Sequence, residues 1–139
     1  MTAKQFFNDF GKALYCIDGI YDEFARKSGV APTLLWILYA LNDGKAHTQK
    51  DICVDWALPK STVNTIVSEL KQNGYVELVP LKGTRREMTV VLTHSGKVYA
   101  NTVLAEIYQK ESDVFEQLNG EEAKLAATMQ KLAELLKKQ

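Results

Sequence analysis

The sequence lacks the features that mark secreted, membrane-spanning or metal-dependent proteins. Its 139 residues include two cysteines, Cys16 and Cys53, too few for a disulfide framework. They form no Cys-x-x-Cys pair, and His47 and His94 lie far apart in the sequence, so a tetrahedral metal site has little local support. The longest nearly apolar run, residues 31–41, is too short to cross a bilayer. We therefore expect no metal, no cofactor and no membrane partner.

Catalytic motifs are missing as well. The chain has no Gly-rich phosphate loop and no Gly-x-Ser-x-Gly nucleophile elbow. No nucleophile or acid has a recognisable partner of the kind that an active site requires, so we expect no enzymatic activity. Residues 1–14 include an acidic side chain and a glycine where a signal peptide would need an unbroken apolar stretch, which predicts a cytoplasmic protein.

Charge is balanced over the whole chain but unevenly distributed. The 17 basic and 17 acidic residues argue against a protein that binds nucleic acid with its entire surface. Residues 60–97 nevertheless carry a net charge of +3. The basic side chains of this segment are Lys60, Lys71, Lys82, Arg85, Arg86 and Lys97. The excess indicates that an anionic partner would bind this segment.

Apolar spacing predicts a mainly helical chain. Over residues 3–27, aromatic and aliphatic side chains recur every three or four positions, which is typical of a helix. Pro32 suits the first turn of a second helix over residues 32–41, and the apolar residues on nearly all its sides predict the buried centre of the domain. Helical spacing returns after Lys97 and again from Glu121 to near the end, with a break at Asn119 and Gly120.

Between these helices the pattern predicts two short helices and a hairpin. Thr48 and Asp51 resemble a capping box that opens a helix at 48–56, and residues 57–59 turn into a helix at 60–73. Residues 75–80 and 87–93 are rich in β-branched and aromatic side chains and flank a polar, basic tip, which is typical of a β-hairpin. This order is that of a winged helix-turn-helix, a mainly α fold with a small β-hairpin wing.

The predicted helix at 60–73 has an unusual polar face. In place of long charged side chains this face carries Ser61, Thr62, Asn64, Thr65 and Ser68. A recognition helix in the major groove needs such short donors and acceptors at base edges, with long charged side chains over the phosphates at its margins. The expected marginal contacts are Lys60 and Lys71 to phosphates, and Lys82, Thr84, Arg85 and Arg86 of the wing to the backbone and the minor groove. The alternatives are an ordinary solvated helix face and a solubilising loop tip.

Residues 48–97 resemble the multiple antibiotic resistance regulator (MarR) family of bacterial transcription factors. "TQKDICVDWALPKSTVNTIVSELKQNGYVEL" is similar to the family's helix-turn-helix, and "TRREMTVVLTHSGK" to its wing and the start of the next helix. The resemblance implies one MarR-like domain over residues 1–139, with a DNA-binding unit at 30–97 and dimerisation helices at 1–29 and 98–139. Thr84 stands where the family has an acidic residue that holds the wing arginine. Thr65 stands where many members have Arg, so this recognition helix is less basic.

Aromatic and sulfur-containing side chains raise further hypotheses. Tyr15, Trp36 and Tyr39 are either the lining of an aromatic effector pocket or plain core residues. Cys53 is expected to be a buried structural thiol. Cys16 falls later in the first helix than the reactive cysteine of the organic hydroperoxide regulators, relatives within the same family, so a sensing role is not favoured.

These observations predict a homodimeric, sequence-specific regulator of transcription that binds double-stranded DNA. We expect a repressor that recognises a pseudo-palindromic operator and responds to a small aromatic effector. The alternative is a winged helix that serves as a protein-interaction scaffold without specific DNA binding, which the balanced charge and Thr65 mildly support.

Overall fold

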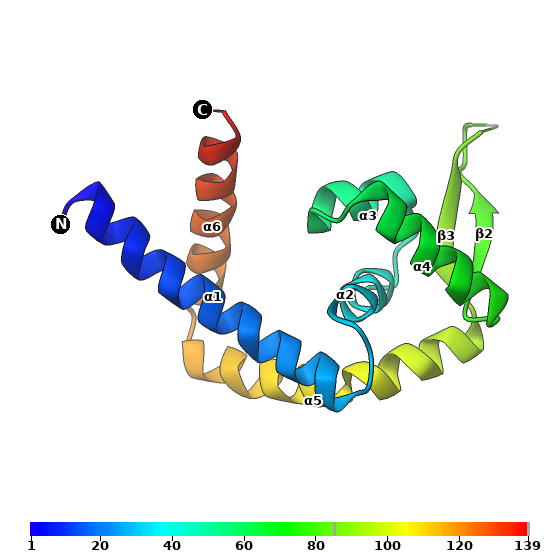
Figure 1. Ribbon diagram of the computed structural model, residues 1–139, viewed down its shortest axis with the longest axis horizontal. Helices are drawn as coiled ribbons and strands as arrows, with labels where there is room; N and C mark the ends of the chain where they lie inside the picture. Colours follow the sequence, from blue (N-terminus) through cyan, green and yellow to red (C-terminus); the bar gives the residue numbers. More distant parts are fainter. Residues whose placement is uncertain (85, 139) are drawn as a thin grey trace. The chain divides into compact units, whose positions relative to one another are not determined.

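The computed structural model describes residues 1–84 and 86–138, which form six helices and a small antiparallel sheet (Figure 1). The helices are α1 (Ala3–Lys27), α2 (Pro32–Leu41), α3 (Gln49–Trp56), α4 (Lys60–Gln72), α5 (His94–Leu118) and α6 (Glu122–Lys137). The strands are β1 (His47–Thr48), β2 (Val76–Pro80) and β3 (Met88–Leu92). The predicted order of helices and hairpin is confirmed. The chain divides into two compact units, Met1–Ala105 and Glu106–Gln139, and the boundary falls within α5.

The first unit is built around α2. Leu35, Ile37 and Leu38 have no exposed surface, which confirms that this helix is the buried centre. Pro32 is its first residue, where the missing N–H leaves no hydrogen bond unmade. The other elements of the unit each contribute to the same core, with Ala25 of α1, Ile52 of α3, Val63 of α4, Val90 of β3 and Leu104 of α5 all fully or almost fully buried.

Helix α1 is anchored to this core at its C-terminal end. Next to the buried Ala25, the Ser28 hydroxyl donates a hydrogen bond to the Val103 carbonyl of α5 at 3.2 Å. The opposite end of α1 starts with a capping box, in which the Thr2 hydroxyl accepts from the Gln5 N–H at 3.2 Å and the Gln5 side chain accepts from the Thr2 N–H at 2.9 Å. The N-terminal half of α1 carries exposed apolar side chains, including Phe6 and Leu14.

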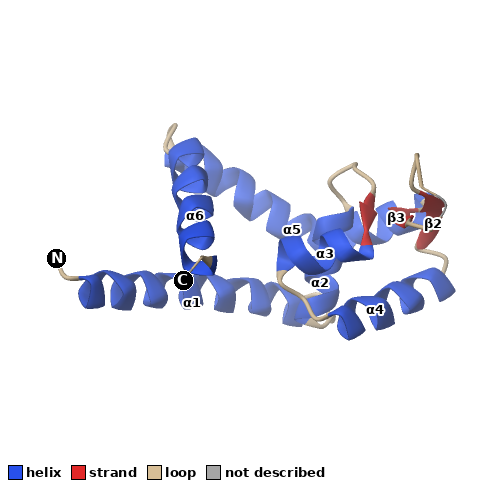
Figure 2. Cartoon of the chain, turned by 90° about the horizontal axis from the view of Figure 1, so that it is seen from above, coloured by secondary structure: helices blue, strands red, loops and turns tan. Residues whose placement is uncertain are grey.

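The sheet has the strand order β1-β3-β2, and both pairings are antiparallel. The hairpin pairs Val76 with Leu92 and ends at Pro80 opposite Met88, on the edge strand where proline is tolerated. β1 pairs with the middle of β3 and was not predicted, because two residues are too few to show an alternating pattern. Figure 2 shows the strands gathered in one place next to α3 and α4.

The second unit contains the end of α5 and the whole of α6. Asn119 and Gly120 connect the helices with positive φ angles of 52° and 92°, which confirms the predicted break. The unit exposes several large apolar side chains: Val114, Phe115, Leu125, Met129, Leu135 and Leu136. In the described part of the chain, no helix combines the length and the apolar character that a bilayer crossing requires.

Candidate nucleic-acid interface

Helix α4 begins after a tight turn from α3. Ala57 adopts a left-handed conformation with φ of 50°, and the Leu58 N–H donates to the Cys53 carbonyl at 3.1 Å, which reverses the chain at the end of α3. Pro59 is the N-cap residue and offers no side-chain cap, so the first N–H groups of α4 depend on solvent or a ligand. Val63, Val67 and Leu70 then bury one face of the helix in the core.

The outward face of α4 consists of side chains whose hydrogen-bonding groups are free. Ser61, Asn64, Thr65 and Ser68 are exposed and Thr62 is half-buried. None of these five side chains makes a hydrogen bond within residues 1–84 and 86–138. A shallow open hollow of about 260 Å³ lies among Ser61, Thr62, Thr65 and Ile66. The predicted polar face therefore presents its hydroxyls and its amide to the solvent.

The wing projects from the sheet, and hydrogen bonds join Leu81, Thr84 and Glu87 beyond the end of its strands. The Leu81 N–H donates to the Glu87 carbonyl at 2.8 Å, and the Thr84 N–H donates to the Leu81 carbonyl at 3.2 Å around Gly83, whose φ is 92°. The Thr84 hydroxyl accepts a hydrogen bond from the Glu87 N–H at 3.2 Å. Thr84 therefore supports the turn rather than the side chain of Arg86.

The cations of this region lie at its margins. Lys60, Lys71, Lys82 and Arg86 are all exposed, at the two ends of α4 and on the wing. Arg85, predicted as a further wing contact, lies outside the described residues. Between the wing residues Leu78 and Arg86–Met88 and the first turn of α3, Thr48–Lys50, there is an open hollow of about 320 Å³. Lys50 therefore joins the cations at the margins of this region. Residue spacing in the sequence had not indicated Lys50.

The end of α4 and the start of α5 meet in what we call the α4–α5 joint, formed by Gly74, Tyr75, Thr93, Ser95, Gly96 and Tyr99. Gly74, with φ of 77°, ends α4, and its carbonyl accepts hydrogen bonds from the hydroxyls of Thr93 at 2.6 Å and Ser95 at 3.0 Å. The Thr93 hydroxyl also accepts from the Gly96 N–H at 3.1 Å, so it caps α5. Sequence reasoning noted this segment only as a family motif.

Backbone and rings approach closely in the same joint. A Cβ atom at Gly96 would lie 1.8 Å from the carbonyl oxygen of Tyr75, so only glycine fits there. The rings of Tyr75 and Tyr99 stack with centroids 4.4 Å apart and an interplanar angle of 9°. Burial, and to a lesser extent the neighbouring Tyr75, raises the pKa of Tyr99 above its ordinary value of 10.0.

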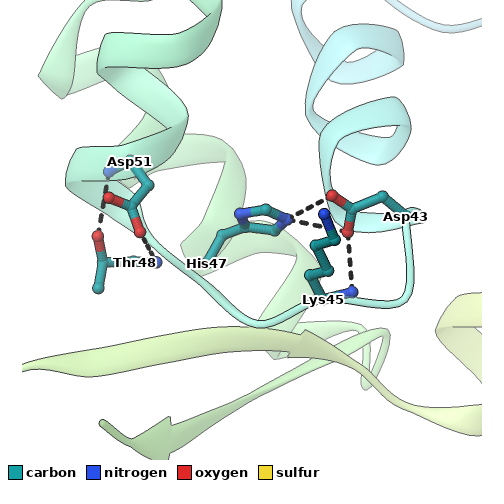
Figure 3. Close-up of polar contacts among 5 residues, drawn as sticks. All are labelled: Asp43, Lys45, His47, Thr48 and Asp51. Atoms are coloured by element: carbon teal, nitrogen blue, oxygen red, sulfur yellow. Dashed lines mark hydrogen bonds and ion pairs between the residues drawn. The ribbon is translucent and has the colours of Figure 1, made fainter.

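The loop between α2 and α3 is held by polar contacts (Figure 3). The Asp43 carboxylate accepts from the Lys45 N–H at 2.9 Å and lies 2.8 Å from Nε2 of His47. Partial burial acts to raise the pKa of Asp43, but the hydrogen bonds from His47 and Lys45 outweigh it, so this pKa lies below its ordinary value of 3.8. The Thr48–Asp51 capping box is also present, at 3.0 and 3.1 Å, as predicted.

Metal-ligating side chains do not gather in the described part of the chain: no group of three or more His, Cys, Asp or Glu side chains is suitably placed there. His47 is engaged with Asp43, and His94 is exposed at the start of α5. Cys16 is exposed on α1, whereas Cys53 is half-buried rather than fully buried as expected. Cys53 lies in α3 next to the turn, where its carbonyl accepts a hydrogen bond from the Leu58 N–H at 3.1 Å.

Two of the three predicted effector residues lie together. Trp36 and Tyr39 contact each other with ring centroids 5.6 Å apart, and both contact Trp56 of α3. Tyr21 of α1 joins this cluster, 5.0 Å from Trp36. Tyr15 is 75% exposed and lies elsewhere on α1. Tyr21 and Trp56 were missed because their helical positions are equally typical of core residues.

A family model described as the MarR family matches residues 28–87, which include the helix-turn-helix and most of the wing. The solved structure of NMB1585, a MarR family regulator from Neisseria meningitidis, is 30% identical to the chain. That match covers 94% of this chain and 93% of the other, with a TM-score of 0.78. The chain belongs to the MarR family.

Two further proteins are similar to the chain, one over part of its length and one in fold. The uncharacterized HTH-type transcriptional regulator YwhA from Bacillus subtilis (strain 168) is 32% identical over 88 residues, and the match covers 63% of each chain, less than two thirds. The MarR of Staphylococcus aureus, solved in complex with salicylate and kanamycin, shares the fold at 18% identity, with a TM-score of 0.69 and coverage of 99% and 93%. This MarR-family protein therefore has the family and fold of transcription regulators rather than of enzymes.

Proposed function

We propose that this MarR-family protein is a homodimeric transcriptional repressor that binds a pseudo-palindromic operator in double-stranded DNA. The observation that carries the proposal is the outward face of α4. Its side chains have free donors and acceptors, and they are braced from behind by the buried Val63, Val67 and Leu70. Such a face suits the base edges of a major groove, where Asn pairs with adenine through two hydrogen bonds and Ser or Thr can donate or accept.

Each side chain of the interface has a distinct expected role. We assign base contacts to Ser61, Thr62, Asn64, Thr65 and Ser68, and phosphate contacts to Lys60 and Lys71 at the two ends of α4. The wing, with Lys82, Thr84, Arg85 and Arg86, would follow the adjacent backbone and minor groove. Since Lys60, Lys71, Lys82 and Arg86 lie at the margins of the polar face, contacts to phosphates would fix the position of the protein on the duplex, and contacts to bases would supply the specificity.

A second copy of the chain would cover the apolar side chains that each unit exposes. Phe6 and Ile17 of α1 are 41% and 54% exposed, and Leu136 of α6 is 55% exposed. Exposed apolar side chains at helical spacing favour association with another helix. We infer that residues 1–29 and 98–139 form the dimer and that 30–97 form the DNA-binding part. A two-fold dimer would set the two recognition helices about 34 Å apart, one turn of B-DNA.

Repression and its control form the finer part of the proposal. A dimer bound across a promoter in the cytoplasm would block transcription, and a small aromatic effector would release it. In support, Trp36, Tyr39, Trp56 and Tyr21 form a half-buried aromatic cluster where α1, α2 and α3 meet. The S. aureus MarR was solved in complex with salicylate and kanamycin. NadR, a protein of similar fold, was solved in complex with 4-hydroxyphenylacetate.

Selection of bound sequences from random duplex DNA tests the DNA-binding proposal. We expect two inverted half-sites about 10 base pairs apart, centre to centre. In a fluorescence-anisotropy titration of the selected duplex, the logarithm of affinity should fall by about 0.9 per neutralised phosphate for each unit of log salt concentration. A chain that binds no duplex at low salt would instead be a protein-interaction scaffold.

Intrinsic fluorescence tests the effector proposal. Trp36 and Trp56 are the two tryptophans of the sequence, and both lie in the aromatic cluster. Titration with salicylate or 4-hydroxyphenylacetate should therefore quench the emission saturably and should weaken DNA binding over the same range of concentration. Quenching that rises linearly without saturation, with DNA affinity unchanged, would contradict an aromatic effector.

A further inference from the structure

We propose that Thr93 is a positioning residue for DNA binding, because its hydroxyl locks the end of the recognition helix α4 to the start of α5. The inference rests on the proposed function, in which one dimer engages two half-sites at once. It concerns residues outside the predicted DNA-contacting set. Thr93 would touch no base and no phosphate. It would act by fixing the orientation of α4 relative to the start of α5.

One hydroxyl serves both helices. The Thr93 hydroxyl donates to the Gly74 carbonyl at 2.6 Å, directly after α4, and accepts from the Gly96 N–H at 3.1 Å in the first turn of α5. Its backbone N–H donates to the Tyr75 carbonyl at 3.0 Å. Ser95 adds a second hydroxyl to the same Gly74 carbonyl at 3.0 Å. A rotation of α4 relative to the first turn of α5 would therefore break several hydrogen bonds at once.

The rest of the α4–α5 joint leaves little freedom for such a rotation. The backbone of Gly96 lies so close to Tyr75 that a Cβ atom would fall 1.8 Å from the Tyr75 oxygen. One turn further along α5, Tyr99 stacks on Tyr75 at 4.4 Å. Tyr75 is tied to α4 in turn, because its N–H donates to the Leu70 carbonyl at 2.9 Å across the glycine that ends the helix.

A fixed joint matters most when two half-sites are bound together. Binding of the second half-site is intramolecular, so its contribution depends on how often the second recognition helix points at its groove. A loosened joint lowers that effective concentration. A single half-site requires only one recognition helix, so its affinity is much less sensitive to the joint.

The experiment compares full-length wild type with Thr93→Val, Thr93→Ser and Ser95→Ala. Each protein is titrated by fluorescence anisotropy against the selected two-half-site duplex and against a duplex with one half-site scrambled. Thr93→Val should lose about tenfold in affinity for the full site, the equivalent of one to two hydrogen bonds, and less than about threefold for the half-site. Thr93→Ser keeps the hydroxyl and should restore the ratio, and Ser95→Ala should lie between.

Thr89→Val is the matched control. The Thr89 hydroxyl also donates to a backbone carbonyl, that of Val79 at 2.9 Å, and lies outside the joint, outside the dimer segments and outside the predicted DNA-contacting set. This variant should keep the full-site to half-site ratio of the wild type. Circular dichroism at the assay temperature establishes that each variant is folded; if Thr93→Val is not, Ser95→Ala decides the question.

The outcomes separate the two proposals. A folded Thr93→Val with the wild-type ratio would overturn the positioning role, and so would an equal loss in Thr93→Ser or in Thr89→Val. Each of these results leaves DNA binding by the wild type intact. If the wild type bound no two-half-site duplex, the proposed function itself would fail.

Discussion

Replacing Gly96 with alanine tests the closest backbone approach in the structure. The new Cβ would lie 1.8 Å from the Tyr75 oxygen, 2.8 Å from its carbonyl carbon and 3.2 Å from its Cα, all backbone atoms that cannot rotate away. Real Cβ atoms are essentially never closer than 3.0 Å, so α5 and Tyr75 must separate. Separation also strains the 3.0 Å hydrogen bond from the Thr93 N–H to the same oxygen.

The expected magnitude follows from three contributions. Forcing extra volume into a packed contact costs about 1–3 kcal/mol. Loss of the Thr93–Tyr75 hydrogen bond costs about 1 kcal/mol. The better helix propensity of alanine in α5 offsets at most about 1 kcal/mol. We therefore expect Gly96→Ala to lower the free energy of unfolding by about 1–4 kcal/mol, or Tm by roughly 3–16 °C.

Urea unfolding followed by circular dichroism, at one protein concentration for all variants, measures this change. Gly19→Ala is the control, because a Cβ at Gly19 in α1 would have no atom within 4 Å. That variant should be as stable as the wild type or more stable by up to about 1 kcal/mol. If Gly96→Ala unfolded at the same urea concentration as the wild type, the described contact between α5 and Tyr75 would be wrong.

Three further predictions concern the cap, the loop and the interface. Thr48→Ala removes the capping box with Asp51 and should cost about 1 kcal/mol of stability in thermal unfolding. The depressed pKa of Asp43 contributes stability that is present above 3.8 and is lost as pH falls through the lower folded value, so Asp43→Asn should flatten stability against pH in that acid range. Asn64→Ala should reduce discrimination at one base pair by about 1–3 kcal/mol, whereas Arg86→Ala should weaken all sequences and lower the salt slope by about one.

Each of these has a result that would count against it. Thr48→Ser should retain most of the stability, and equal losses for both Thr48 variants would mean that the hydroxyl is not the cap. Parallel loss of stability in acid for wild type and Asp43→Asn would exclude the carboxylate as the source. Identical selected sequences for wild type and Asn64→Ala would argue against base readout by that amide.

Residue spacing predicted the elements that have several helical turns or clear start and stop signals in the sequence. α1 and α2 follow from aliphatic and aromatic residues at intervals of three and four. Pro32 marks the start of α2, and the Thr48–Asp51 box marks the start of α3. β1 was not predicted, because tertiary contacts decide its pairing with β3 and its own two residues do not. The close approach at Gly96 is equally invisible, since a glycine in a first helical turn has several ordinary explanations.

The candidate site was predictable only where it depends on a local sequence pattern and not on tertiary packing. The polar face of α4 is a local property of one helix, so Asn64 and its neighbours could be assigned from spacing alone. The aromatic cluster depends on how α1 turns about its axis. Tyr15 and Tyr21 are six residues apart, about 120° around a helix, so only one of them can face Trp36. Which one does so depends on packing with α2.

The short pairing of β1 with β3 connects the base of the wing to the helix-turn-helix. Thr48 is both the strand partner of Thr89 and the N-cap of α3, so the base of the hairpin is held to that helix. Beyond Met88 and Pro80, where the ladder ends, the described hydrogen bonds of Leu81, Thr84 and Glu87 join these residues to one another and not to α3 or α4. In the proposed DNA complex, insertions or deletions at the loop apex would therefore change how far the wing extends along the duplex and leave the contacts of α4 as they are, so the apex is a suitable place to engineer new specificity.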